Sequence, residues 1–264
     1  MREPARSPRR EAARRVTVRL LFVFYGLLLA EGPLRKWVLP GASNALVFLR
    51  DPVMLMILLA AAVAGPSRGA RQAMALFAAV VLGCLACVTG QLAGSDVAPL
   101  AILAGLRNYF LFVPLAWIVA DTVTAVDYAR WLRLNLWLAG PIGLLVVVQY
   151  RSAPTSFINA VPGGGNDGVF LLVADVVRPY GLFSFTLGHS VFAAWMVGVL
   201  LAGFSARRRF NIGPWLAAAG ALGTLAMGAC SGSRTTLLLA AAVLLAFLLA
   251  ALASPVATQR RRAM

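Results

Sequence analysis

Three arginines and the only histidine of this sequence lie where a charge in an apolar chain requires an explanation. Arg107 lies about 9 residues inside the fourth apolar stretch, or ~14 Å deep at 1.5 Å per residue. Arg178 and His189 begin and end the segment RPYGLFSFTLGH, and Arg234 opens the last apolar stretch within SGSRTTLL. Because a guanidinium keeps its charge and binds phosphate oxygens through paired hydrogen bonds, these positions predict a site for an anionic ligand.

Arg107 has three alternative roles at that depth. An arginine there costs at least ~2.5 kcal/mol, so it must face a ligand or a watery cavity, pair with Asp51, or extend to the outer surface. Arg50 and Asp51 are neighbours that do not face each other on a helix, so each needs a different partner. The dipeptide Asp51-Pro52 predicts a helix start, with Asp51 as its N-cap, inside the second apolar stretch. This implies either a span broken at membrane depth or a short surface helix leading into a short span.

The first turn of the last apolar stretch also suits an anion. Ser233 is expected to cap this helix, while Arg234 projects beside the free N–H groups of the first turn. His189 is the candidate catalytic base, and its alternative role is that of a polar residue at a helix start. Asp167 and Asp175 in the outer loop are further candidate bases.

Long apolar helices must position these residues. The chain is 61% hydrophobic and 12% charged, whereas a soluble domain is about half apolar and about a quarter charged. Since about 20 apolar residues cross a bilayer as a helix, we predict an all-α polytopic integral membrane protein with about eight transmembrane helices. The predicted spans are 16–32, 45–64, 73–93, 98–120, 134–150, 187–204, 212–230 and 234–253.

The net charge of +15 follows this topology rather than a nucleic-acid-binding surface. With both termini cytoplasmic, every basic cluster between spans falls on the cytoplasmic side, as the positive-inside rule requires. These clusters are 68–71, 130–133, 207–209 and 260–262. We therefore predict a basic cytoplasmic tail over 1–15, a transmembrane domain over 16–253 with an outer loop at 151–186, and a basic cytoplasmic tail over 254–264. No nucleic acid is expected as a partner.

Two other patterns do not indicate chemistry. Cys84 and Cys87 have C-x-x-C spacing without a second pair, so they and Cys230 are expected to be small buried hydrophobic residues. The run PGGGNDG lacks the Lys-Ser/Thr ending of a nucleotide-binding loop, so it predicts a turn. We expect no metal and no cofactor.

Four segments, in their order along the chain, resemble bacterial O-antigen ligases and polysaccharide polymerase-like membrane proteins. They are EGPLRKWVLP with LVFLRDP, GLRNYFLFVPL, RPYGLFSFTLGH and SGSRTTLL, and the similarity extends from about Glu31 to Leu239. The resemblance implies an inner-membrane glycosyltransferase that moves a glycan from an undecaprenyl-diphosphate carrier to another glycan or to lipid A–core. It also implies that Arg178 and Arg234 hold the diphosphate, and we expect Arg107 as a deeper supporting charge.

The chain departs from that family after Met264, where members commonly continue with an outer loop that carries a histidine and a further arginine. The family's catalytic histidine therefore has no counterpart, because His189 lies in a different motif. Two interpretations stay open: a shortened gene product, or a relative that binds the carrier lipid without full catalysis.

Two other classes of function compete with a glycan ligase or polymerase. A membrane transporter would explain charges at membrane depth and a broken helix, although the sequence has no internal repeat. A non-catalytic membrane subunit would act with other polysaccharide-assembly proteins. The expected partners are membrane lipid and, for the ligase and the subunit, an undecaprenyl-diphosphate-linked glycan.

Overall fold

The computed structural model describes residues 8–94, 99–166, 168–172 and 176–253, and its regular elements there are helices. Only an isolated antiparallel bridge, between Leu171 and Val177, has extended pairing in this part of the chain. The all-α prediction is therefore confirmed for these residues. The predicted tail 254–264 lies outside them, and residues 8–15 of the other predicted tail are helical.

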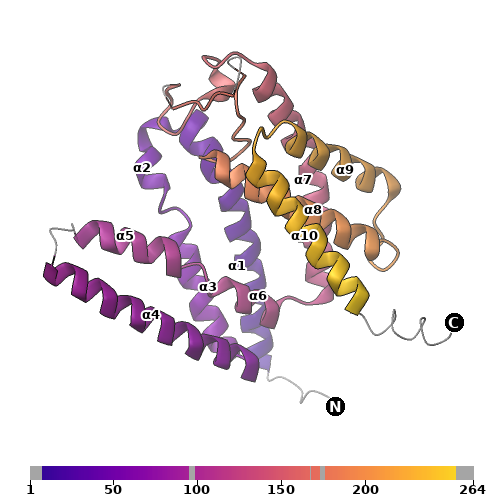
Figure 1. The fold of residues 1–264 in the computed structure, drawn as a ribbon. Coiled ribbons are helices and arrows are strands. Elements are labelled where there is room, and N and C mark those ends of the chain that lie inside the picture. The colour runs from indigo at the N-terminus through magenta and orange to yellow at the C-terminus, as the bar shows by residue number, and fades with distance from the viewer. Residues whose placement is uncertain (1–7, 95–98, 167, 173–175, 254–264) are drawn as a thin grey trace. The chain divides into compact units, whose positions relative to one another are not determined.

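The chain divides into two compact units. Unit 1 consists of Met1–Leu27 with Phe48–Asp127, and unit 2 consists of Leu28–Val47 with Tyr128–Met264. The elements, labelled in Figure 1 where there is room, are α1 (Pro8–Pro33), η1 (Leu34–Val38), η2 (Pro40–Ala42), α2 (Ser43–Leu46), α3 (Asp51–Ala64), α4 (Arg68–Gly94), α5 (Pro99–Phe110), α6 (Leu115–Thr122), α7 (Ala125–Arg151), η3 (Phe157–Asn159), α8 (Thr186–Ser205), α9 (Pro214–Ala229) and α10 (Arg234–Ala253).

The predicted helix start at Asp51-Pro52 is confirmed; whether it breaks a span at membrane depth or begins a short span stays a prediction. A turn at 47–50 separates α2 from α3, which begins at Asp51 with Pro52 in its first turn. Asp51 is the first helical residue rather than the cap, since Arg50 occupies the N-cap position and no side chain caps the helix. The break coincides with the boundary between the two units.

The predicted span 98–120 contains an interruption, because α5 ends at Phe110 and α6 begins only at Leu115, and Ile102–Thr122 is still long and apolar enough to cross a membrane. Pro114 explains the interruption. It has no N–H to donate, and its ring disfavours helical geometry in the residue before it. Pro114 then serves as the N-cap residue of α6.

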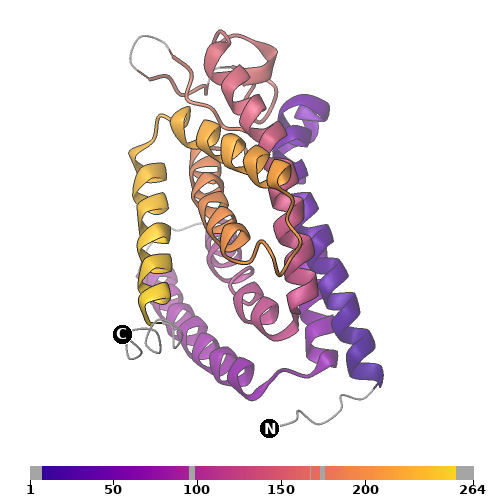
Figure 2. The same ribbon diagram turned by 90° about the vertical axis from the view of Figure 1, so that its right-hand side faces the viewer.

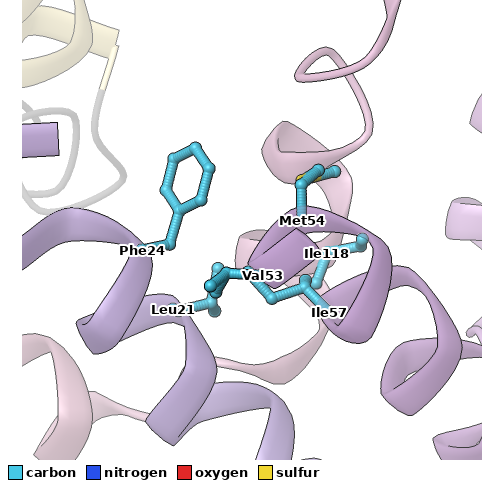
Figure 3. Close-up of a cluster of buried hydrophobic side chains, with 6 residues drawn as sticks. All are labelled: Leu21, Phe24, Val53, Met54, Ile57 and Ile118. Carbon is cyan, nitrogen blue, oxygen red and sulfur yellow. The ribbon is translucent and has the colours of Figure 1, made fainter. Parts of the chain in front are cut away.

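The core of unit 1 is formed where α1, α3 and α6 meet. Six buried side chains make this cluster: Leu21, Phe24, Val53, Met54, Ile57 and Ile118 (Figure 3). Met54 and Ile57 are fully buried. They lie on the first turns of α3, so the helix start at Asp51 also sets the position of this core.

In unit 2, α8, α9 and α10 lie beside one another and next to α7 (Figures 1 and 2). Glycines allow α7 and α9 to approach at backbone distance: a Cβ on Gly143 would lie 2.7 Å from Cα of Gly223. A Cβ on Gly220 would lie 2.5 Å from Leu136. Small residues at such crossings are the usual basis of close helix packing in membranes.

Seven helical stretches of the described residues are long and apolar enough to cross a membrane. They are Pro8–Val38, Pro40–Ala64, Gly69–Gly90, Ile102–Thr122, Ala125–Arg151, Thr186–Ser205 and Arg234–Ala253. The predicted span 212–230 is a shorter apolar helix of 16 residues, α9. The multi-pass class is supported, while the number of spans and the side of each terminus stay predictions.

The prediction that the cysteines are buried is wrong for Cys87, which is exposed on α4.

We predict that Gly223→Ala destabilises unit 2, because its Cβ would collide with the backbone of Ala139. Overpacking of this kind costs about 1–3 kcal/mol. Gly140→Ala is the matched control, since a Cβ there meets nothing within 4 Å. Thermal unfolding in detergent should show a lower midpoint for Gly223→Ala alone; equal midpoints for the two variants would contradict the backbone contact.

Candidate anion-binding site

Two segments distant in the sequence meet in unit 2: the end of α1 with η1, and the segment RPYGLFSFTLGH. Lys36 Nζ donates to the carbonyl oxygen of Gly181 at 2.8 Å, and Arg35 Nη1 donates to Ser184 Oγ at 3.0 Å. Both basic residues come from η1, a π-helical turn closed by the bond from Leu39 N–H to the carbonyl of Leu34. Turns of this wider type are rare and frequently occur at functional sites.

Arg35 has several partners besides Ser184. Its Nη1 also pairs with Glu31 Oε1 at 3.2 Å, and its Nε donates to Ser43 Oγ at 3.2 Å. Arg35 and Glu31 are both buried. A buried ion pair surrounded by further hydrogen bonds is a structural arrangement, so Arg35 orients the η1 turn rather than offering a free charge.

Gly181 is the centre of this region. Its N–H donates to Gln149 Oε1 at 2.8 Å, and its carbonyl accepts from Gln149 Nε2 at 3.3 Å as well as from Lys36. Its φ of +56° is a conformation that favours glycine. A Cβ at this position would lie 3.0 Å from Nδ1 of His189, so the ring packs directly on the glycine backbone.

His189 lies in the first turn of α8 and is 1% exposed. Its Nε2 is 3.2 Å from the carbonyl oxygen of Met227. Because a carbonyl can only accept, Nε2 carries the proton and Nδ1 of the neutral ring is left with a lone pair. No described residue forms a hydrogen bond with Nδ1. His189 thus lies where a polar residue at a helix start is expected, which is the alternative to a catalytic base. Its catalytic role stays a prediction.

Arg178 lies in one of the two short segments that are paired by the isolated bridge between Leu171 and Val177. Its backbone N–H donates to the carbonyl of Phe170 at 2.8 Å. Its Nε is buried and has no hydrogen-bond partner among the described residues.

Tyr180 anchors the same segment: its hydroxyl donates to the carbonyl of Gly168 at 2.7 Å and accepts from Phe170 N–H at 3.0 Å. Burial raises the pKa of the Tyr180 phenol, against smaller lowering effects of Phe170 N–H and the Arg178 charge, so the hydroxyl stays a donor.

Arg234 is the first residue of α10 and is exposed. The expected cap beside it is not observed: Ser233 Oγ is buried and forms no hydrogen bond with a described residue. The same holds for Thr236 Oγ1, which is 1% exposed and lies in the same helical turn. Buried hydroxyls normally find a partner, so two in one turn indicate room for a ligand group or ordered water.

Arg178 and Arg234 lie at the same end of unit 2. Gly232 packs so closely on Leu172 that a Cβ on the glycine would collide with that side chain. Leu172 and Arg178 belong to the two segments joined by the bridge of the outer loop, and Gly232 precedes Arg234 by two residues. The first turns of α8 and α10, which pack together, lie at this end (Figures 1 and 2). We call Arg178, His189, Ser233, Arg234 and Thr236 the α8/α10 site.

Arg107 belongs to unit 1 and has a partner there. Its Nε and Nη2 bind the two carboxylate oxygens of Asp51 at 2.6 and 2.7 Å. Of the three alternatives for Arg107, the structure contains the ion pair. The pair also matches the helix dipoles, because Asp51 opens α3 and Arg107 lies in the last turn of α5. An additional role of Arg107 in substrate binding stays a prediction.

Arg50 and Asp51 are expected to have different partners, and Arg50 contacts aromatic rings. Its guanidinium lies over the rings of Phe112 and Phe24, at 5.3 and 6.0 Å from their centroids. Arg107 lies over Phe112 at 5.8 Å as well. Phe112 thus forms cation–π contacts with two guanidinium groups at the α5/α6 break.

Sequence reasoning missed Lys36, Arg35 and Gln149 as residues that build this region. The signal for the first two was present: two adjacent basic residues at the end of an apolar span are costly unless they are paired or extend to water. Gln149 gave no signal, because an amide near the end of an apolar helix is common. Asp167 and Asp175, the loop candidates for a base, lie outside the described residues.

Comparison with protein-family models, curated proteins and solved structures finds no match to this chain. The class that the fold supports is therefore a multi-pass, all-helical membrane protein. Its function has to be argued from the α8/α10 site itself.

We predict that Gly181→Ala destabilises unit 2 by ~2 kcal/mol or more, because it adds a Cβ at positive φ and against His189. Gly165→Ala in the same outer loop is the control, since its Cβ would meet nothing within 4 Å. Thermal unfolding of the two purified variants measures the difference. A Gly181→Ala variant as stable as Gly165→Ala would contradict the packing described here.

The Asp51–Arg107 pair generates a second prediction. Arg107 and Asp51 are mostly buried, with 16% and 18% of their side chains exposed, so Asp51→Asn or Arg107→Gln should each cost about 1–3 kcal/mol by leaving the remaining group without its partner. The double variant should cost less than the sum of the single variants, because it leaves no unpaired charge. Strictly additive losses in a double-mutant cycle would rule out a direct interaction.

Proposed function

We propose that this chain binds a polyprenyl-diphosphate-linked glycan at the α8/α10 site and transfers the glycan to a hydroxyl acceptor in cell-surface polysaccharide biosynthesis. The observation that carries the proposal is the buried Nε of Arg178, which lacks a partner among the described residues and lies at the same end of unit 2 as Arg234. Bacterial inner-membrane location and outward orientation are parts of the same proposal.

The chemistry of a diphosphate fits this arrangement. Two guanidinium groups neutralise its charge, and the N–H groups in the first turns of α8 and α10 add the positive ends of two helix dipoles. The hydroxyls of Ser233 and Thr236 can donate to further phosphate oxygens. The apolar helices around the site suit the polyprenyl chain.

Transfer requires a bond change at the anomeric carbon of the sugar. The acceptor hydroxyl oxygen forms a bond to that carbon, the bond from the carbon to the diphosphate oxygen breaks, and the polyprenyl diphosphate leaves with the electron pair. Arg178 and Arg234 stabilise the charge that develops on the leaving group. The hydroxyl proton needs an acceptor, and the lone pair on His189 Nδ1 is the candidate.

Binding to undecaprenyl diphosphate, compared with undecaprenyl monophosphate, tests the first step. Arg178→Gln and Arg234→Gln should each weaken diphosphate binding about 10- to 100-fold, since a charge-assisted hydrogen bond contributes about 1.5–3 kcal/mol. Arg71→Gln on α4 removes the same charge from an exposed position outside unit 2 and serves as the control. Unchanged affinity in both site variants would refute the site.

Transfer is tested separately in a strain that lacks the gene. Complementation with Arg178→Ala or Arg234→Ala should give little polymerised glycan or capped lipid A at normal protein levels. A variant that binds the diphosphate normally but gives no product would separate binding from catalysis. If every binding-competent form, including the wild type, gave no product, a non-catalytic subunit would replace the transferase.

A transporter is the second candidate, favoured by the interrupted helices α2/α3 and α5/α6 with their charges Asp51 and Arg107. Those two charges neutralise each other, which argues against a free ion site in unit 1. Solute uptake by vesicles that contain the purified chain, with no affinity for undecaprenyl diphosphate, would favour this candidate.

A further inference from the structure

A pocket between α7 and α8, away from the α8/α10 site, leads to a cluster of arginines. It has a volume of about 240 Å³ and is lined by Tyr128, Trp131, Leu132, Asn135, Trp195, Gly198 and Val199. All of these residues belong to unit 2. Asn135 Oδ1 accepts from Trp195 Nε1 at 3.4 Å, and its amide donates to the carbonyl of Trp131 at 2.9 Å. The amide is thus engaged within the protein, and the pocket offers mainly apolar and aromatic surface.

A line of aromatic rings connects this pocket to the α8–α9 connection. The rings of Trp131 and Trp195 lie 6.2 Å apart, and Tyr128 meets Phe210 edge-on at 6.1 Å. The guanidinium of Arg209 lies 5.9 Å from the ring centroid of Phe210. Phe210 thus contacts both Tyr128, which lines the pocket, and the guanidinium of Arg209.

Arg207, Arg208 and Arg209 form a basic run beside these rings. Arg207 Nε donates to the carbonyl of Ile212 at 3.1 Å and shapes the connection. Arg208 and Arg209 are exposed. Within the described part of the chain, none of the three forms an ion pair with a carboxylate.

We infer that this pocket and the basic run bind one anionic phospholipid. The phosphate lies on Arg208 and Arg209, and the part of one acyl chain nearest the headgroup lies in the pocket against Trp131 and Trp195. Basic clusters at the ends of membrane helices attract anionic headgroups. Tryptophan and tyrosine belong at the same depth, where their rings contact the acyl–headgroup boundary. The volume lies below the 300–1,000 Å³ of full ligand pockets, which matches part of a chain rather than a whole molecule.

Native mass spectrometry in detergent tests this inference with phosphatidylglycerol and phosphatidylcholine as probes. The wild-type chain should retain one phosphatidylglycerol in preference to phosphatidylcholine. The double variant Arg208→Gln/Arg209→Gln should retain it at least 10-fold less, and so should Trp195→Ala, which removes a wall of the pocket. The arginine variant changes only exposed positions, so the result does not depend on the folding of Trp195→Ala.

Arg19→Gln/Arg71→Gln is the matched control, since it removes two exposed charges from unit 1. It should retain phosphatidylglycerol like the wild type. If both double variants lost phosphatidylglycerol equally, the net charge of the chain rather than this site would explain lipid retention, and the inference would be overturned. Glycerol 3-phosphate that displaced the lipid at equal concentration would overturn the acyl pocket and leave a phosphate site. Arg178→Gln should not change retention; a loss there would mean that the lipid occupies the α8/α10 site instead.

Discussion

The buried amino group of Lys36 constrains the rest of unit 2. The side chain is 1% exposed, its Nζ is 2.8 Å from the carbonyl of Gly181, and it lies 4.5 Å from the ring centroid of Trp37. A lysine amino group removed from water is tolerated only where fixed dipoles or rings replace the lost hydration. The segment around Gly181 must therefore pass the end of α1. The same glycine also binds Gln149 of α7 and packs on His189 of α8.

The contacts at Gly181 explain the position of the α8/α10 site. Because α7, α8 and η1 all contact Gly181, the segment that carries Arg178 is tied to the first turn of α8. Arg178 Nε is held in a buried position without a described partner, and a buried donor in that state costs about 1–3 kcal/mol. In the proposed function, the diphosphate supplies the acceptor that Arg178 Nε lacks among the described residues.

The arginines of the chain show why residue type alone does not define a binding site. Arg107, Arg50 and Arg178 all interrupt apolar sequence, yet Arg107 binds a carboxylate and Arg50 lies over aromatic rings. Arg107 with its carboxylate and Arg50 with its rings lie beside the helix breaks at 47–50 and 111–114 in unit 1. A break exposes backbone groups, and the nearby charges and rings stabilise that irregular stretch.

The sequence by itself determined the helical class, seven of the apolar stretches that can span a membrane, and the helix start at Asp51-Pro52. These follow from hydropathy and from proline geometry, which act over a few neighbouring residues. The tertiary structure decided that Arg107 pairs with Asp51, that Lys36 meets Gly181 across 145 residues, and that Ser233 does not cap α10. It also decided that Arg178 and Arg234 lie at the same end of unit 2. Partners of this kind depend on which helices pack together, and packing is a property of the whole unit rather than of any local pattern.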